Sequence, residues 1–299
     1  MKPLLKWAGG KRRLVETLFD VFPSSYDFKK NNYFEPFIGG GAVFFALASR
    51  LSSTELEAVG RRTHSFFLSD TNDDLINFYK VVREDPAGLI KKMRAMSLSV
   101  KKADFLKVRC SMPKSRVERA ARLLYLNRLC FNGLYRVNSK GEFNVPFGSY
   151  KNPKIFDKDQ ILACSQWLKK SELSTESFKS VVTKAKKGDL VYFDPPYIPL
   201  SVTSSFSSYA KEGFGEHDQR DLAKVIETLT KKGVLVVLSN SDTKLSREIF
   251  GGLDLYSIAV RRSISADGAK RKEVKELIGT NYPLTSMSQP ANLRKLRVS

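Results

Sequence analysis

The run "DPPY", Asp194 to Tyr197, has residue types suited to binding a flat ring with an amino group, and it follows the apolar segment 189–193. Pro195 and Pro196 cannot continue a helix or donate hydrogen bonds within a sheet, so they make a stiff exit from a strand. Open α/β sheets bind ligands beyond the carboxyl ends of their strands, where Asp194 would lie. Its carboxylate and a neighbouring carbonyl can accept hydrogen bonds from one amino group, while the Tyr197 ring offers a stacking face. A strand cap followed by a turn would explain the prolines but not the complete set.

A glycine turn and a second acid form another group. The segment "FEPFIGGGAVFF" has the order strand, turn and helix, with Phe37, Gly39 and Gly41 at the turn. Glycines let a backbone approach a ligand, and a helix N-terminus offers free N–H groups. Asp70 ends the next strand-like segment, where a carboxylate can accept hydrogen bonds from ribose hydroxyls. The glycines lack the G-x-G-x-x-G spacing, so we predict an adenosine-containing ligand rather than a dinucleotide. A purely structural turn is the alternative.

The N-terminal segment "KWAGGK" places Lys6, Trp7 and Lys11 around a pair of glycines. An indole at this position can cover a cationic or aromatic ligand. The alternative is a flap in which Trp7 is only a hydrophobic anchor.

The composition indicates a polyanionic partner. Lys and Arg number 51 against 31 Asp and Glu, which gives a net charge of +20. Such an excess most often serves nucleic-acid binding. The two histidines and three cysteines lack metal-ligand spacing, so no metal site is predicted, and the cysteines suit a reducing cytoplasm. The chain has no apolar run of about 18 residues, so we expect no membrane partner.

Two blocks of alternating strands and helices, 1–85 and 154–280, would position these groups. The uninterrupted apolar run 234–239 is typical of a parallel strand that is buried on both faces. We predict an α/β fold in which both blocks join one doubly wound sheet, with 86–153 as a second, mainly helical domain. Residues 281–299 are expected to form a flexible tail.

The middle segment changes character part-way. Residues 86–130 are predicted to be helical, and Ser115 and Glu118 fit a capping box at one helix start. Residues 131–153 have no sustained period and interleave aromatic with basic side chains, which is typical of a long functional loop.

Several motifs together resemble the Dam-type DNA adenine-N6 methyltransferases of the D12 class. In order along the chain they are "LKWAGGK", "EPFIGGGAVF", "SDTNDDLINFY", "LYLNRLCFNGLYRVNSKGEFNVPFG", "DPPYIPLS" and "VRRSISADGAKRKEV". The resemblance covers about residues 3–280. It implies a Rossmann-like methyltransferase sheet with an inserted target-recognition domain, S-adenosyl-L-methionine as cofactor, and double-stranded DNA as partner. The fourth motif further suggests the subgroup that methylates adenine in GATC.

The resemblance also implies roles for individual residues. Asp194, Pro195, Pro196 and Tyr197 would hold a flipped adenine. The methyl donor would be bound by Trp7, Lys11, Phe37, Gly39, Gly41, Asp70 and Asp194. DNA would be contacted by Lys6, Phe131, Asn132, Leu134, Arg136, Asn138, Pro146 and Tyr150. Among these, Lys6 would reach the outer guanine, Phe131 would insert into the base stack, and Arg136 would read a guanine.

Three departures from the family pattern stand out. Phe131 occupies the place of a tyrosine in close relatives, and Ser149 stands where they can carry arginine. The polar excursion 52–63 is longer than usual, and we assign it no function.

The sequence leaves two other functions open. One is the same chemistry on another DNA sequence, as in a restriction-modification system, or on RNA. The other is a basic DNA-binding protein without activity. For all of these functions we expect a cytoplasmic, nucleoid-associated protein of bacterial or phage origin. We also expect a monomer that has no obligate protein partner.

Overall fold

A computed structural model of the chain describes residues 1–7, 9, 11, 14–24, 26–51, 57, 59, 65–98, 100–198, 214–261, 273–284, 290 and 292–296. These divide into two compact units. The first unit comprises Met1–Gly10 and Ile38–Glu176, and the second comprises Lys11–Phe37 and Ser177–Ser299. Apart from Glu57 and Val59, the excursion 52–63 lies outside the described residues, as does most of the sixth motif.

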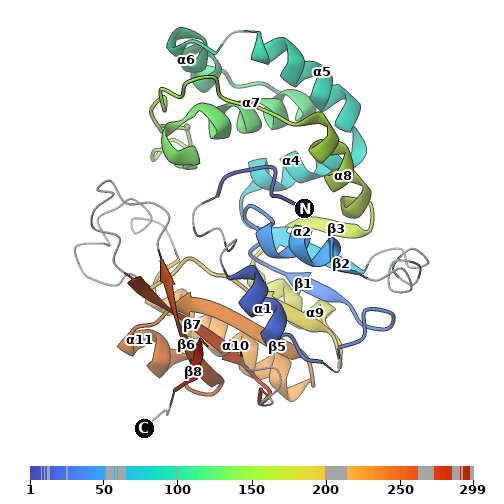
Figure 1. Cartoon of the computed structure of the whole chain (residues 1–299), viewed down its shortest axis with the longest axis vertical. Helices are drawn as coiled ribbons and strands as arrows, with labels where there is room; N and C mark the ends of the chain where they lie inside the picture. The colour runs from blue at the N-terminus through green and yellow to red at the C-terminus, as the bar shows by residue number, and fades with distance from the viewer. Residues whose placement is uncertain are drawn as a thin grey trace. The chain divides into compact units, whose positions relative to one another are not determined.

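The first unit combines a pair of strands with a layer of helices (Figure 1). Its elements are α2 (Ala42–Ala48), β2 (Phe66–Asp70), α4 (Asp73–Glu84), α5 (Pro86–Ser97), α6 (Lys102–Cys110), α7 (Arg116–Leu129), the 3-10 turn η1 (Phe131–Gly133), α8 (Lys158–Leu168) and β3 (Ser171–Thr175). Strands β2 and β3 are parallel, from Phe66 opposite Ser171 to Asp70 opposite Thr175. Helix α4 packs against α7 and α8, and α7 also contacts α5 and α6.

The second unit contains six strands in the order β1-β4-β5-β7-β6-β8. Its elements are α1 (Val15–Val21), β1 (Tyr33–Glu35), η2 (Phe178–Ser180), α9 (Val181–Lys184), β4 (Leu190–Phe193), α10 (Glu216–Lys231), β5 (Leu235–Ser241), α11 (Lys244–Ile249), β6 (Asp254–Arg261), β7 (Glu273–Thr280) and β8 (Leu293–Lys295). Strands β1, β4 and β5 are parallel, whereas β7 is antiparallel to both β5 and β6. Helix α10 packs on β5.

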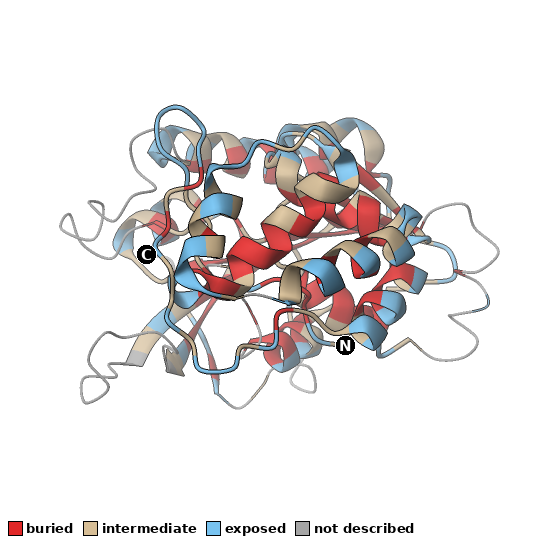
Figure 2. Ribbon diagram, turned by 90° about the horizontal axis from the view of Figure 1, so that it is seen from above, coloured by how far each residue is buried: buried red, intermediate tan, exposed pale blue. Residues whose placement is uncertain are grey.

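These elements confirm the predicted mixed α/β fold class. Figure 2 shows buried residues concentrated on the strands and the inward helix faces. The run predicted as a doubly buried strand is β5, whose residues from Val236 to Ser241 are all buried. Among the described residues, no helix is long and apolar enough to span a membrane.

Two features differ from the expectation. Ser115 precedes α7 but makes no side-chain cap, so the predicted capping box is wrong. The carboxylate of Glu118 instead pairs with Lys92 Nζ at 2.7 Å. The predicted tail 281–299 contains strand β8, which pairs with β6 from Ile258 to Tyr256. The Glu118 side chain therefore forms a long-range ion pair instead of a helix cap. Residues 293–295 of the predicted tail form backbone hydrogen bonds with β6.

Candidate functional site

The carboxylate of Asp194 lies at the carboxyl end of β4, as the sequence predicted. Strands β4 and β5 pair with Phe193 opposite Leu238, which places Asp194 beside Ser239. The Ser239 hydroxyl donates to Asp194 Oδ1 at 3.0 Å, and Lys11 Nζ lies 2.7 Å from the same oxygen. Asp194 Oδ2 accepts no hydrogen bond from any other described residue. One oxygen is thus held by the fold, and the second can accept from a ligand.

The electrostatics of this pair favour a firmly placed carboxylate. The Lys11 side chain is only 5% exposed and that of Asp194 is 20% exposed. Burial raises the pKa of Asp194 above its usual value, and the positive charge of Lys11 partly opposes the rise. In the structure Lys11 fixes this carboxylate, and its predicted contact with a donor stays a prediction.

The two prolines differ in what their carbonyls do. Gln219 Nε2, from α10, donates to the Pro196 carbonyl at 2.8 Å. The Gln219 side chain in turn accepts from Asn240 Nδ2 at 3.1 Å, and Asn240 Oδ1 accepts the Ile198 N–H at 3.2 Å. No described residue donates to the Pro195 carbonyl. The Pro196 carbonyl therefore serves the fold, whereas the Pro195 carbonyl, on a buried residue, keeps its capacity to accept a hydrogen bond.

Tyr197 is held at both its hydroxyl and its ring. Its hydroxyl donates to Glu276 Oε2, on β7, at 2.7 Å. Lys11 Nζ lies 4.2 Å from the ring centroid, a cation–π distance. Burial, reinforced by the nearby carboxylates of Asp194 and Glu276, raises the pKa of Tyr197 well above its usual value. The tyrosine is therefore neutral and held in place, and its stacking role stays a prediction.

Phe37 belongs to an aromatic cluster in the second unit. Its ring stacks on Phe178 with centroids 5.5 Å apart and meets Phe214 edge-on at 5.4 Å. Phe193, the last residue of β4, lies at 6.4 Å. The Phe37 ring, which was predicted to contact the ligand, is thus held in place by three other aromatic rings.

In the first unit, the glycine turn and Asp70 are joined directly. The Gly39 N–H donates to Asp70 Oδ2 at 3.2 Å, and the Asn72 N–H donates to Oδ1 at 3.0 Å. Tyr79 donates its hydroxyl to the Gly39 carbonyl at 2.8 Å. Burial raises the pKa of Asp70, while these backbone N–H groups oppose the rise. Each carboxylate oxygen keeps a lone pair, so the group can still accept from a hydroxyl pair.

Trp7 packs against the same glycine turn. Its indole stacks on Tyr135 with centroids 5.3 Å apart and planes 24° apart. A Cβ on Gly39 would lie 2.8 Å from Trp7 Cδ1, and one on Gly40 would lie 3.0 Å from Trp7 Cβ. Gly39 also has a positive φ of 46°. The glycines are therefore required by the indole as well as by the backbone of the turn.

We expect Gly39→Ala to destabilise the protein by about 2 kcal/mol or more. A left-handed residue with a side chain costs about 1–2 kcal/mol, and the clash with Trp7 adds to that cost. Denaturant unfolding would measure the effect. Gly141→Ala is the matched control, because Gly141 has a φ of 76° but nothing within 4 Å of an added Cβ. If both variants lose the same free energy of unfolding, the packing of Trp7 on the turn makes no contribution to the stability of the protein.

The segment 131–150 is a loop closed by two isolated bridges, Cys130 with Phe147 and Val137 with Phe143. At its start, Phe131 is 50% exposed and Asn132 has a left-handed φ of 54°. Asparagine adopts a left-handed φ more readily than most residues, so the distinctive feature at this end of the loop is the exposed Phe131 ring.

The predicted contact residues of this loop differ in their surroundings. Arg136 is half-buried, and its Nε donates to Asn144 Oδ1 at 2.7 Å, so its guanidinium is already oriented. Asn138 is engaged in its own turn, where Oδ1 accepts the N–H groups of Lys140 and Glu142. Pro146 is exposed and Leu134 is half-buried. The departing residue Ser149 is exposed with a φ of 51°.

Lys6 joins this loop from the N-terminal segment. Its Nζ lies 4.6 Å from the centre of the Tyr150 ring, and Tyr150 donates its hydroxyl to the Cys130 carbonyl at 3.0 Å. The first unit thus brings together Lys6 and the whole predicted recognition loop. It also brings together Trp7, the glycine turn and Asp70.

Comparison with known proteins assigns the family. Residues 7–264 match the D12 class N6 adenine-specific DNA methyltransferases. The chain belongs to this family. The predicted resemblance is therefore confirmed, and so is the predicted class of activity, methylation of adenine N6 in DNA.

Individual relatives of this D12 class methyltransferase align over nearly its whole length. The type II methyltransferase M1.LlaDCHI of Lactococcus lactis subsp. cremoris is 42% identical over 290 residues, covering 94% of this chain and 96% of the relative. The type II methyltransferase M.MjaIII of Methanocaldococcus jannaschii is 40% identical, with coverages of 94% and 99%. The DNA adenine methylase of Escherichia coli K12 is 34% identical, with coverages of 94% and 96%. These names state no target sequence, so GATC stays a prediction.

Sequence reasoning missed several residues around the methyltransferase motifs. They are Asn127, Gln219, Ser239, Asn240 and Glu276. Ser239 and Asn240 lie near the end of a predicted strand, but their contacts depend on how that strand pairs with the "DPPY" strand, which local sequence patterns do not determine. Asn127 is a polar residue within an apolar helix face, which is a signal. Nothing in the sequence pointed to Gln219 or Glu276.

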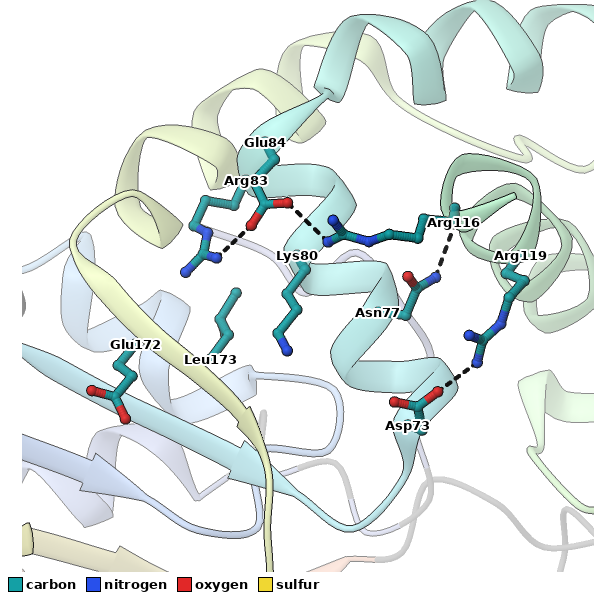
Figure 3. Close-up of a pocket in the computed structure, with 9 residues that line it drawn as sticks. All are labelled: Asp73, Asn77, Lys80, Arg83, Glu84, Arg116, Arg119, Glu172 and Leu173. Carbon is teal, nitrogen blue, oxygen red and sulfur yellow. Dashed lines mark hydrogen bonds and ion pairs between the residues drawn. The ribbon is translucent and has the colours of Figure 1, made fainter. Parts of the chain in front are cut away.

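The first unit also contains a pocket of about 600 Å³ (Figure 3). It is lined by Asp73, Asn77, Lys80, Arg83, Glu84, Arg116, Arg119, Glu172 and Leu173. Arg119 pairs with Asp73 at 2.6 Å, and Arg116 pairs with Glu84 at 2.8 Å. None of the predicted site residues lines it. It is a hollow whose charges largely compensate one another, and we assign it no part in methyl transfer.

Proposed function

We propose that this methyltransferase transfers a methyl group from S-adenosyl-L-methionine to adenine N6 within GATC in double-stranded DNA. One observation carries the chemistry: Asp194 Oδ2 and the Pro195 carbonyl both accept no hydrogen bond from other described residues. They flank a rigid strand exit whose remaining polar groups are held by Lys11, Ser239 and Gln219. This arrangement fits an amino group with two hydrogens to donate.

The acceptors address the weakness of the adenine amino group as a nucleophile. Its lone pair is delocalised into the ring, so the nitrogen is nearly planar. Hydrogen bonds to Asp194 Oδ2 and the Pro195 carbonyl would favour a tetrahedral nitrogen whose lone pair can attack. When bound, S-adenosyl-L-methionine supplies a methyl group on a positively charged sulfur. At N6 a new N–C bond would form as the donor's C–S bond gives its electron pair to sulfur, and the proton lost from N6 would pass to the Asp194 carboxylate and then to solvent.

The base must leave the duplex to reach these acceptors. Tyr197 would then stack on the flipped ring, because its hydroxyl is anchored to Glu276 and cannot swing away. Pro196 would contribute stiffness rather than an acceptor, since Gln219 occupies its carbonyl. Phe131, exposed at the start of the loop, would fill the gap left in the base stack.

For the donor, the residues present fit an adenosine group. The Asp70 carboxylate is held by backbone N–H groups yet retains lone pairs for ribose hydroxyls. The space beside Gly39 is taken by the Trp7 indole and the space beside Gly41 by the Phe45 ring, so the donor contacts of these two glycines are proposed from the family resemblance. Trp7 offers an aromatic surface beside the turn. Lys11, Asp194 and Phe37 are further proposed donor contacts from the family resemblance. We propose that 1–85 and 154–280 form the catalytic domain.

For the target, we propose that residues 86–153 form the recognition domain. Lys6 and Arg136 would read guanines, because cationic donors match the O6 and N7 acceptors of that base. Asn132, Leu134 and Pro146 would meet other base edges, while Asn138 and Tyr150 would contact the backbone. The net charge of +20 supports the polyanionic partner.

A second candidate is the same reaction on another DNA sequence within a restriction-modification system. The type II methyltransferases among the relatives favour keeping it. We further propose a monomeric, cytoplasmic protein that associates with DNA in a bacterium or a phage-infected cell.

Nucleoside analysis tests the reaction itself. DNA of mixed sequence is incubated with the protein and radiolabelled S-adenosyl-L-methionine, digested to nucleosides and separated. We expect label in N6-methyl-2′-deoxyadenosine alone. Label in a methylated cytosine, or none with a donor that binds, would contradict it.

The rate at low concentrations of donor and DNA, which reports the ligand-free enzyme, should fall in acid with a midpoint above the usual aspartate pKa of 3.8. The reason is that only the ionised Asp194 accepts from the amino group, and burial raises its pKa. The rate is therefore lost as the pH decreases through the raised pKa. A pH profile of kcat/KM measures this, with unfolding followed in parallel. An undiminished kcat/KM below pH 3.8 would count against an ionised Asp194 as acceptor.

A further inference from the structure

Asn127, on α7, is a buried amide whose hydrogen bonds link two distant parts of the first unit. It is 1% exposed. Its Oδ1 accepts the Lys6 N–H at 2.8 Å, and its Nδ2 donates to the Lys6 carbonyl at 2.7 Å. The same Nδ2 donates to the Gly133 carbonyl at 3.0 Å. One side chain thus pairs with both peptide groups of Lys6, as a neighbouring strand would, and also with the recognition loop.

A second set of contacts fixes the Lys6 side chain in the same place. Gly133 has a φ of 66°, and a Cβ there would lie 2.5 Å from both Cβ and Cδ of Lys6. The Tyr150 ring lies under the ammonium group at 4.6 Å. Arg128, next to Asn127, donates to the Leu4 carbonyl at 2.6 Å. The aliphatic stem of Lys6 therefore passes directly over the loop that contains Arg136.

We propose that Asn127 is a positioning residue for target specificity. It sets the register between Lys6 and the segment 133–136, so that the two cationic side chains meet guanines at a fixed separation. This inference rests on the proposed function, in which Lys6 and Arg136 read guanines. Asn127 itself touches no base.

The test compares kcat/KM on a GATC duplex with kcat/KM on a duplex in which the outer guanine is replaced by adenine. The ratio of the two measures discrimination at the base pair assigned to Lys6. We expect Asn127→Ala to reduce this ratio by about 5- to 150-fold, the value of one good base contact. Lys6→Ala should reduce it similarly, and the double variant should reduce it no further, because Asn127 acts through Lys6.

Asn77→Ala is the matched control. Asn77 is also a buried amide of the first unit, 6% exposed, and it donates to the Arg116 carbonyl at 3.0 Å. Its loss should lower stability and leave the discrimination ratio unchanged. Gly133→Ala approaches Lys6 from the other side, without altering the Asn127 side chain, and should lower the ratio as Asn127→Ala does.

The outcomes separate the two levels of the proposal. A wild-type protein that methylates both duplexes equally would refute the assigned role of Lys6, and with it the proposed target. If the wild type discriminates, but Asn127→Ala and Gly133→Ala lose activity equally on both duplexes, the positioning role is overturned while the proposed function stands. A soluble Gly133→Ala variant with the wild-type discrimination ratio would by itself also overturn the positioning role.

Discussion

Replacing Asp194 with asparagine should reduce methyl transfer at saturating substrates by at least about 10²- to 10³-fold, the cost of losing one preorganised polar group in an active site. Lys11 and Ser239 both donate to Oδ1, so the amide oxygen of the introduced asparagine would take that position. The amide nitrogen would then face the adenine amino group, donor against donor. The substitution keeps the shape of the site and inverts the one interaction on which the chemistry depends.

Asparagine is a better test here than alanine. The Lys11 side chain is 5% exposed, and removing the partner of a buried charge costs about 3–5 kcal/mol of stability. An inactive Asp194→Ala variant could therefore be inactive because it is unfolded. Asp194→Asn leaves an acceptor for Lys11, so thermal unfolding should change far less than activity does.

Asp189→Asn is the control for Asp194→Asn. Asp189 is 3% exposed, precedes β4 at its other end, and accepts the N–H groups of Asn32 and Lys186. Its replacement should lower stability without abolishing turnover. Full activity of Asp194→Asn, with donor and DNA binding intact, would refute the role of Asp194 as acceptor.

The second large effect concerns Arg136. Its replacement by alanine should relax discrimination at one guanine by about 5- to 150-fold, since a bidentate arginine–guanine pair contributes about 1–3 kcal/mol. Asn144 accepts from Nε at 2.7 Å through its side chain and from Nη2 at 3.4 Å through its carbonyl, which fixes the guanidinium plane. The outer edge still has one N–H on each of Nη1 and Nη2 for two parallel hydrogen bonds. Arg136→Lys should not restore discrimination, because an ammonium group lacks this planar fork.

The measurement for Arg136 is kcat/KM on GATC and on each single-base variant. Lys140→Ala, an exposed charge in the same loop, should weaken activity on all duplexes to the same extent. If Arg136→Ala also weakens all duplexes equally, Arg136 contacts phosphate rather than a base.

The order of helices and strands could be predicted because it follows from local hydrophobic period. The run at 234–239 corresponds to β5, and the segment before "DPPY" corresponds to β4. Short segments that are apolar at every position are typical of strands buried on both faces of a sheet. The position of Asp194 at a strand end followed from the same pattern. These features depend on residues that are close together in the sequence, so they can be predicted from the sequence alone.

The partners of Asp194 and Tyr197 could not be predicted in the same way. The Ser239 contact depends on the register of β4 against β5, which sets Phe193 opposite Leu238. Glu276 reaches Tyr197 only because β7 is inserted between β5 and β6 as an antiparallel strand. Strand order and register are decided by long-range packing, and a single sequence carries little of that information.

Protection of GATC sites tests directly whether the protein methylates adenine in this sequence. Unmethylated plasmid is treated with the protein and S-adenosyl-L-methionine, then digested with one nuclease that cuts only unmethylated GATC and another that requires methylated adenine in GATC. We predict resistance to the first and sensitivity to the second, and the untreated pattern when Asp194→Asn replaces the wild type or the donor is omitted. Continued cleavage by the first nuclease, with N6-methyladenine present in the same DNA, would show that the target is a different sequence.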